Sequence, residues 1–108
     1  NLQNEATKSG VLPEELGVLV DEVKHLPNLS LRGLMAIPAP ETLFDRQRTT
    51  FARLRELLQA TNREHQTNMD CLSMGMTDDL EAAVAEGATH VRVGTAIFGP
   101  RQRPASNP

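Results

Sequence analysis

Apolar side chains recur along the chain at two different spacings, which predict alternating strands and helices. Residues 13–26 place Leu and Val at helical spacing, and Pro13 with two acids opens the segment, as expected at the positive end of a helix dipole. Residues 41–60 predict the longest helix, and residues 78–86 predict another that Gly87 ends. The apolar segments between the helices predict strands at 29–37, 69–74 and 90–93, and residues 1–4 are interpreted as the end of a further strand.

The order of these elements predicts an α/β fold with a parallel sheet. Strands that alternate with helices need crossover connections, and such connections join parallel strands. Residues 29–37 are largely apolar rather than alternating, as is typical of a parallel strand covered on both faces. After the last strand, Gly94 and Thr95 lead into a helical turn that ends at Phe98. Residues 101–108 carry no apolar pattern, so we expect a flexible C-terminal tail there.

Composition and charge exclude several classes of protein. The 108 residues fit one domain at most, and no apolar run approaches the ~18 residues of a membrane span. Eleven basic and fourteen acidic residues give a net charge of −3, which argues against a nucleic acid or an anionic membrane as the partner. One cysteine cannot form an internal disulfide, and no signal peptide is visible. We therefore expect a cytoplasmic protein, or a mitochondrial one if the source is a eukaryote.

Two segments at predicted strand ends carry residues suited to binding an anion. Ser73–Thr77 leads into a helix, and Arg92–Thr95 leads into the last helical turn. Ligands of parallel α/β sheets bind at the carboxyl ends of the strands, and phosphate sites after the last two strands recur in (β/α)8 barrels. Glycine lets the backbone approach a ligand, while hydroxyl and helix-start amide groups donate to phosphate. From the residues alone, a phosphate site and ordinary turn glycines with helix caps stay equally open.

Other candidate residues give weaker signals. Arg92 lies between two valines, so strand alternation turns it to the opposite face, where either an acidic side chain or a ligand is its partner. Cys71 lies inside a strand and is interpreted as a small buried hydrophobe. The arginines within 46–63 alternate with acids, which indicates a solvated helix face. No metal-ligand spacing relates Cys71 to the histidines, which are His25, His65 and His90.

Four stretches of the chain resemble one known family. They are Lys8–Gly10, Leu31–Pro38, Leu72–Asp79 and Val91–Gly99, and the last two are highly specific in this order. With them, nearly the whole chain resembles the pyridoxal-phosphate homeostasis proteins, the YggS/PROSC-like family. The fold of that family is a single (β/α)8 barrel, similar to the N-terminal domain of alanine racemase.

The resemblance implies that this chain is only part of such a barrel. TIM barrels need roughly 200 residues or more, and this chain begins at Asn1 rather than Met. We therefore interpret it as processed, tagged or cut from something longer. Residues 1–100 are expected to form the C-terminal half of the barrel, with the end of strand 5, then strands 6 to 8 and their helices.

The resemblance also implies a site for pyridoxal phosphate. Arg92 is expected to face the pyridine nitrogen of the cofactor. The Schiff-base lysine of the family lies on the first strand, which is absent here, and neither Lys8 nor Lys24 matches it. This chain is therefore not expected to hold the cofactor covalently. The residues implied as the cradle of the phosphate are Ser73, the backbone of Met74 and Gly75, Gly94 and Thr95.

An arginine opposite the pyridine nitrogen favours cofactor holding over catalysis. It stays protonated and gives the nitrogen no proton, so the ring is a poorer electron sink for carbanion chemistry. The resemblance thus implies a protein that holds and delivers pyridoxal phosphate, with no established turnover. Two alternatives stay open. One is a fragment of a pyridoxal-phosphate-dependent barrel racemase or decarboxylase, and the other is a half-barrel that acts only as an assembly unit and self-associates through exposed strand edges.

Overall fold

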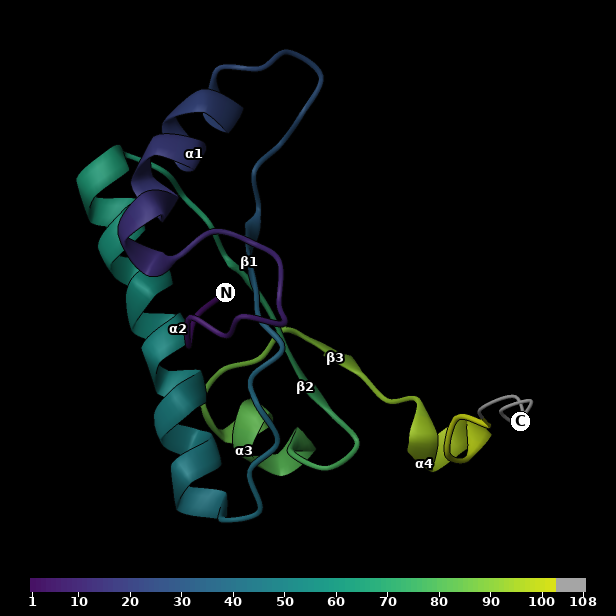
Figure 1. Ribbon diagram of the computed structural model, residues 1–108. Coiled ribbons are helices and arrows are strands. Elements are labelled where there is room, and N and C mark those ends of the chain that lie inside the picture. The colour runs from purple at the N-terminus through teal and green to yellow at the C-terminus, as the bar shows by residue number, and fades with distance from the viewer. Residues whose placement is uncertain (103–108) are drawn as a thin grey trace.

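Three short parallel strands form a sheet whose strand order follows the chain. The computed structural model describes residues 1–102, in which β1 pairs with β2 and β2 pairs with β3. Parallel neighbours need crossover connections, and a helix follows each strand (Figure 1). The elements are the 3₁₀ turn η1 (Pro13–Glu15), α1 (Leu16–Lys24), β1 (Gly33–Met35), α2 (Phe44–His65), β2 (Cys71–Met76), α3 (Leu80–Ala85), β3 (His90–Arg92) and α4 (Thr95–Phe98).

The hydrophobic core lies between one face of the sheet and the helices α2 and α3 (Figure 1). Alternation along β2 turns Leu72 and Met74 toward these helices, and Met74 is fully buried. Phe51 of α2 enters the same core, and full burial of a side chain of this size contributes about 1.5–3 kcal/mol. The buried core residues are Ala36, Phe51, Leu54, Leu58, Met69, Leu72, Met74, Ala82 and Ala83.

The opposite face of the sheet stays open within residues 1–102. Met35 and Ile37 alternate with Ala36, which is buried in the core, and they are 60% and 41% exposed. In Figure 1, α1, α2 and α3 lie on one side of the strands, and α4 lies beyond the end of β3, apart from them. Parallel sheets are usually covered on both faces, so this face lacks its usual cover.

The predicted strands are only partly correct. Residues 1–4 form a turn, in which the N–H of Asn4 donates to the carbonyl of Asn1 (3.3 Å), so the described sheet has three strands where four were expected. The segment 29–37 is a strand only over Gly33–Met35, the part paired with β2. A Cβ on Gly33 would lie 1.9 Å from the carbonyl oxygen of Cys71, which shows how closely these two backbones approach.

The predicted helices differ from the observed ones at their ends. The helix expected over 41–60 runs from Phe44 to His65, and the one expected over 78–86 covers Leu80–Ala85. No helix among the described residues combines the length and the apolar character needed to cross a bilayer. Of the predicted tail, residues 101 and 102 have no regular structure, and residues 103–108 lie outside the described part of the chain.

A buried carboxylate fastens α3 to α2. Glu86 follows α3 and is 7% exposed, and its carboxylate accepts hydrogen bonds from Arg55 and from Nε of Arg48 (2.8 Å). These bonds hold the pKa of the Glu86 carboxyl below its usual value, and the bond from Arg55 has the larger effect. Because α3 directly follows the loop after β2, the two ion pairs help to fix the helix behind that loop.

Candidate functional site

An open cleft lies where the carboxyl ends of the three strands meet. Its volume is about 1170 Å³, and its walls come from the segments that follow β1, β2 and β3. The predicted site residues Gly94 and Thr95 line it, together with Met76 and Thr77. Ligands of parallel α/β sheets bind at this end of the strands, so the cleft is the candidate site. Its charged lining residues are Lys8, Glu41, Asp78, Asp79 and Arg101.

A side-chain hydrogen bond joins the loops after β2 and β3. The backbone N–H of Ala96, in the first turn of α4, donates to Oγ1 of Thr77 at 3.2 Å. Within the loop after β2, the carboxylate of Asp79 accepts the N–H of Met76 at 2.7 Å instead of capping α3. Thr77 is therefore a candidate site residue near Thr95, and the sequence left its role open between a phosphate donor and a helix cap.

A buried glutamine at the start of α2 ties two of the cleft loops together. Gln47 is 9% exposed, and its Nε2 donates to the carbonyls of Glu41 (2.6 Å) and Asp78 (3.3 Å). The Glu41 carboxylate accepts the N–H groups of the next two residues, each at 3.0 Å. Gln47 stands in the same helical register as the buried Phe51 and Leu54. A polar residue at a core position was the sequence signal that could have pointed to it.

The two predicted cradle glycines differ in what the fold requires of them. Gly75 has a φ of +103°, and a Cβ there would lie 2.6 Å from Cβ of Ala83, so the fold itself requires glycine. Gly94 has a φ of −109°, and nothing lies within 4 Å of a Cβ built on it. Neither backbone strain nor steric crowding therefore requires glycine at position 94, which lines the cleft.

The other predicted cradle residues, Ser73 and Met74, lie further down β2. Ser73 pairs with residues of both neighbouring strands and is half-buried. The side chain of Met74 is fully buried in the core, so only its backbone can contact a ligand. Neither residue lines the cleft. The structure therefore brings Gly94 and Thr95 near Thr77, with the Ser73 hydroxyl deeper in the sheet.

Arg92 reaches across the sheet from β3 to the end of β1. Its Nη2 donates to the carbonyl of Ala36 at 3.2 Å, and the strand order requires the side chain to pass over β2. The partner found within residues 1–102 is thus a backbone carbonyl, not an acidic side chain. Nε of Arg92 is buried and has no hydrogen-bond partner among these residues. A buried donor without a partner costs about 1–3 kcal/mol, so an acceptor atom of a ligand would be stabilised there.

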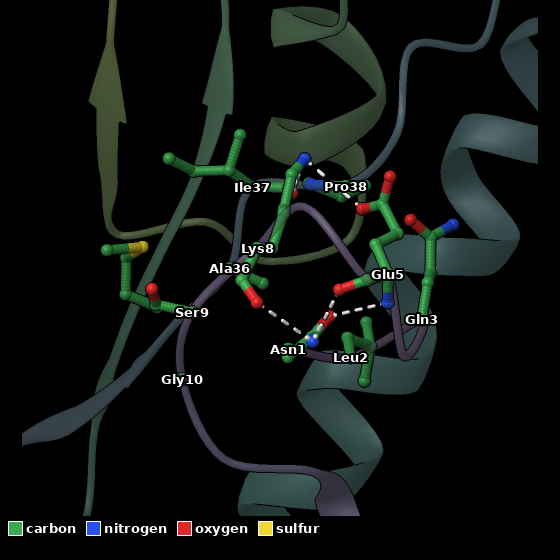
Figure 2. Close-up of a pocket in the computed structure, with 11 residues that line it drawn as sticks. Asn1, Leu2, Gln3, Glu5, Lys8, Ser9, Gly10, Ala36, Ile37 and Pro38 are labelled. Atoms are coloured by element: carbon green, nitrogen blue, oxygen red, sulfur yellow. Dashed lines mark hydrogen bonds and ion pairs between the residues drawn. The ribbon is translucent and has the colours of Figure 1, made fainter.

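Both lysines of the chain make polar contacts. Nζ of Lys8 donates to the carbonyl of Ile37 (2.7 Å) and pairs with Glu5 (3.2 Å). Figure 2 shows these contacts at a second cavity of about 450 Å³, which shares Lys8, Ile37 and Pro38 with the cleft. Lys24 of α1 donates to the carbonyl of His65 at 2.8 Å. Of the two lysines, Lys8 is the one that lines the cleft.

Within residues 1–102, no three His, Cys, Asp or Glu side chains are grouped so that they could hold a metal ion. Cys71, expected to be buried, is half-buried beside Asp70, with Sγ 3.4 Å from the carboxylate. It precedes Leu72, which faces the core, so alternation places Cys71 on the open face.

Comparison with known proteins decides the family. The alanine racemase N-terminal domain family matches residues 2–102. The chain belongs to this family. It is 58% identical over 101 residues to the pyridoxal phosphate homeostasis protein of Pseudomonas aeruginosa. This alignment covers 94% of this chain and 42% of the relative. It is 50% identical over 101 residues to the protein of the same name from Escherichia coli. That alignment covers 94% of this chain and 43% of the relative.

Two solved structures of one protein also resemble this chain. PipY of Synechococcus elongatus with pyridoxal phosphate bound has a TM-score of 0.78 at 34% identity, covering 86% of this chain and 44% of PipY. PipY without the cofactor has a TM-score of 0.81 and covers 92% of this chain and 46% of PipY. The chain thus spans less than half the length of these relatives. The predicted resemblance to pyridoxal-phosphate homeostasis proteins, and the predicted α/β fold with parallel strands, are confirmed.

Proposed function

We propose that residues 1–100 form the C-terminal half of a (β/α)8 barrel and carry the phosphate-binding part of a pyridoxal-phosphate site. In this assignment β1, β2 and β3 are strands 6 to 8, and the turn at residues 1–4 follows strand 5. The coverage of 42% to 46% of each relative supports a half-barrel. The open face of the sheet supports it too, because the inner face of a barrel strand packs against the other strands.

The whole protein is proposed to hold and deliver pyridoxal phosphate in the cytoplasm. Relatives at 50% and 58% identity are named for the homeostasis of this cofactor, and PipY has been solved with the cofactor bound. When bound, pyridoxal phosphate supplies an aldehyde and an electron-accepting ring. The residues of this chain would position the phosphate and the ring nitrogen.

The observation that carries this proposal is the open space beside Gly94. The fold gives no steric reason for glycine at that position, whereas close approach of a phosphate to the backbone does. Thr95 and Thr77 place two hydroxyl groups at the same cleft. Hydroxyl and backbone N–H groups are donors suited to a phosphate.

Arg92 is the residue proposed to meet the pyridine nitrogen. Its buried Nε without a partner is a donor that an acceptor on the cofactor would satisfy. Because a guanidinium stays protonated, it donates to the ring nitrogen and leaves that nitrogen without a proton of its own. Such an environment favours holding the cofactor over carbanion chemistry.

The test is a titration of the 108-residue chain with pyridoxal phosphate, followed by absorbance, then by borohydride reduction and intact mass. We expect binding that inorganic phosphate competes for, and no reducible adduct. An adduct at Lys8 or Lys24 would show that this chain supplies its own Schiff base. Absence of any phosphate-competable binding would overturn the cradle assignment.

A double variant sharpens this titration. Ser73→Ala with Thr95→Ala should weaken binding by about 1–3 kcal/mol for each lost hydrogen bond to the charged phosphate. The matched control is Thr49→Ala with Thr50→Ala, which removes two hydroxyls that bond only within α2 (3.0 and 3.3 Å). Equal affinity of the two double variants would count against both predicted hydroxyl contacts.

A further inference from the structure

Three polar or charged side chains are buried among residues 1–102, those of Gln47, Thr61 and Glu86. Of these, only Gln47 makes its hydrogen bonds to loops rather than to a helix or a helix side chain. Thr61 donates to the carbonyl of Leu57 in its own helix, and Glu86 joins α3 to α2. Gln47 instead reaches out of α2 to the carbonyls of two loops. Burying a carboxamide is costly unless its hydrogen bonds are made, so these loop contacts account for a glutamine at a core position.

The two acceptors of Gln47 belong to different cleft walls. Glu41 lies in the segment after β1, and Asp78 lies in the loop after β2. Both amide hydrogens of one Nε2 are available for the two carbonyls, so one side chain sets the distance between the two loops. Gln47, Glu41 and Asp78 all line the cleft.

The third cleft loop joins through the neighbouring residue. Thr77, which precedes Asp78, accepts the N–H of Ala96 at the start of α4. The contacts therefore run from Gln47 to Asp78, and from Thr77 to Ala96, across the ends of β1, β2 and β3. The Ala96 N–H directly follows Thr95, so a movement of the loop after β2 would also move the predicted phosphate ligands.

We propose that Gln47 is the positioning residue of this site. It holds the loops after β1 and β2 at a fixed separation and, through Thr77, holds the first turn of α4 where Gly94 and Thr95 can meet a phosphate. This inference rests on the proposed function for its effect on binding, but the bridge itself is a property of the free protein. A loop fixed before binding spares the entropy of ordering it when the ligand arrives.

The bridge is tested first without ligand, by amide hydrogen exchange of the 108-residue chain. Gln47→Met keeps the side-chain length and removes both donors. Thr61→Val is the matched control, because it removes a buried hydroxyl from the same helix away from the cleft. We expect faster exchange of the Ala96 N–H in Gln47→Met than in a Thr61→Val control of equal global stability. Equal exchange in the two variants would overturn the bridge.

The second test measures affinity for pyridoxal phosphate and for inorganic phosphate. Gln47→Met should weaken both by about 3- to 10-fold, the effect of about one net hydrogen bond, whereas Thr61→Val should leave both unchanged. Gln47→Glu places a carboxylate against two carbonyls at neutral pH. Acidification adds a proton to this carboxylate, and the proton can be donated to one of the carbonyls. The affinity of Gln47→Glu, divided by that of wild type at the same pH, should therefore recover as the pH falls.

The outcomes separate the two proposals. A pH-dependent recovery of affinity in Gln47→Glu, absent from Gln47→Met, supports the bridge where the folded fraction, followed by circular dichroism, is the same at each pH, because a buried carboxylate also lowers stability in a pH-dependent way. Wild-type affinity in Gln47→Met would overturn the positioning role even if Ala96 exchange changes. If the wild-type chain binds neither probe, the proposed function fails, and the exchange of Ala96 still decides whether Gln47 bridges the loops.

Discussion

At the scale of single residues, the two glycines predicted for the phosphate cradle are required for different reasons, and of the two only Gly94 lines the cleft. Gly75 has a positive φ and packs against Ala83, so its requirement comes from the fold. Gly94 has an ordinary φ and open space around it, so the requirement there comes from whatever enters the cleft. The sequence shows both as glycines after or within an apolar strand and cannot separate them, because the difference lies in tertiary neighbours.

This contrast gives a paired prediction. Gly75→Ala should lower the free energy of unfolding by about 1–3 kcal/mol, because it combines left-handed backbone strain with a contact of 2.6 Å to Ala83. Gly94→Ala should change the free energy of unfolding by less than about 0.5 kcal/mol while weakening pyridoxal-phosphate binding. Urea denaturation and cofactor titration measure the two effects. If Gly94→Ala bound the cofactor as well as wild type, the glycine would not be reserved for a ligand.

Arg92 shows how far alternation alone leads. Its place on a strand between valines predicts a side chain on the opposite face with a polar partner. The register between β2 and β3 shifts between Ser73 and Met76, and this irregularity helps to set which neighbours Arg92 meets. The carbonyl of Ala36, which lies on β1's side of the sheet, is 56 residues away in sequence. A contact at that separation cannot be predicted from local pattern.

At the scale of elements, the order was predictable, and so was the existence of every element except the strand expected at residues 1–4, which is a turn. The ends of the elements were not predictable. The polar segment after residue 60 looks like a connection, yet α2 continues to His65. Asn62 explains the difference: its side chain accepts the N–H of Met69 (2.8 Å) and donates to the carbonyl of Met69 (2.9 Å). These bonds fasten the end of the helix to the segment just before β2, and Gln66 ends the helix in a left-handed conformation.

The junction of α2 and α3 gives a prediction about pH. The pKa of Glu86 is lowered in the folded chain by Arg55 and Arg48, so its ion pairs stabilise the fold above the ordinary carboxyl pKa of about 4.3. That stabilisation is lost as the pH falls through the lowered value. Glu86→Gln should therefore be less stable than wild type at pH 7, and the difference should shrink in acid. Chemical denaturation at a series of pH values measures it.

The matched control for Glu86 is an exposed ion pair. Asp70 binds Arg32 through two hydrogen bonds (2.9 and 3.0 Å), yet both side chains are 62% exposed. The bonds lower the pKa of Asp70, but solvent screens such pairs. Asp70→Asn should thus cost less at pH 7 than Glu86→Gln. An equal or larger loss of stability in Asp70→Asn would mean that the burial of Glu86 does not account for the stabilisation by its ion pairs.

At the scale of the whole molecule, the fold is asymmetric in its cover. The helices protect one face of the sheet, while Met35 and Ile37 stay exposed on the other. β3 pairs with β2 alone among the described strands, so its outer edge presents free backbone groups. The chain spans 42% to 46% of the relatives compared above, and the half-barrel proposed here would account for both the uncovered face and the free edge.

The uncovered face predicts self-association of the isolated chain. We expect its mass, followed by sedimentation over a wide range of concentrations, to rise above that of the monomer, because a sheet face that exposes Met35 and Ile37 beside a free edge favours pairing. Met35→Lys puts a charge on that face and should keep the chain monomeric. Val18→Lys alters an exposed apolar residue of α1 instead and should associate as wild type does. A wild-type chain that stays monomeric throughout, or equal effects of both substitutions, would show that the open face does not drive assembly.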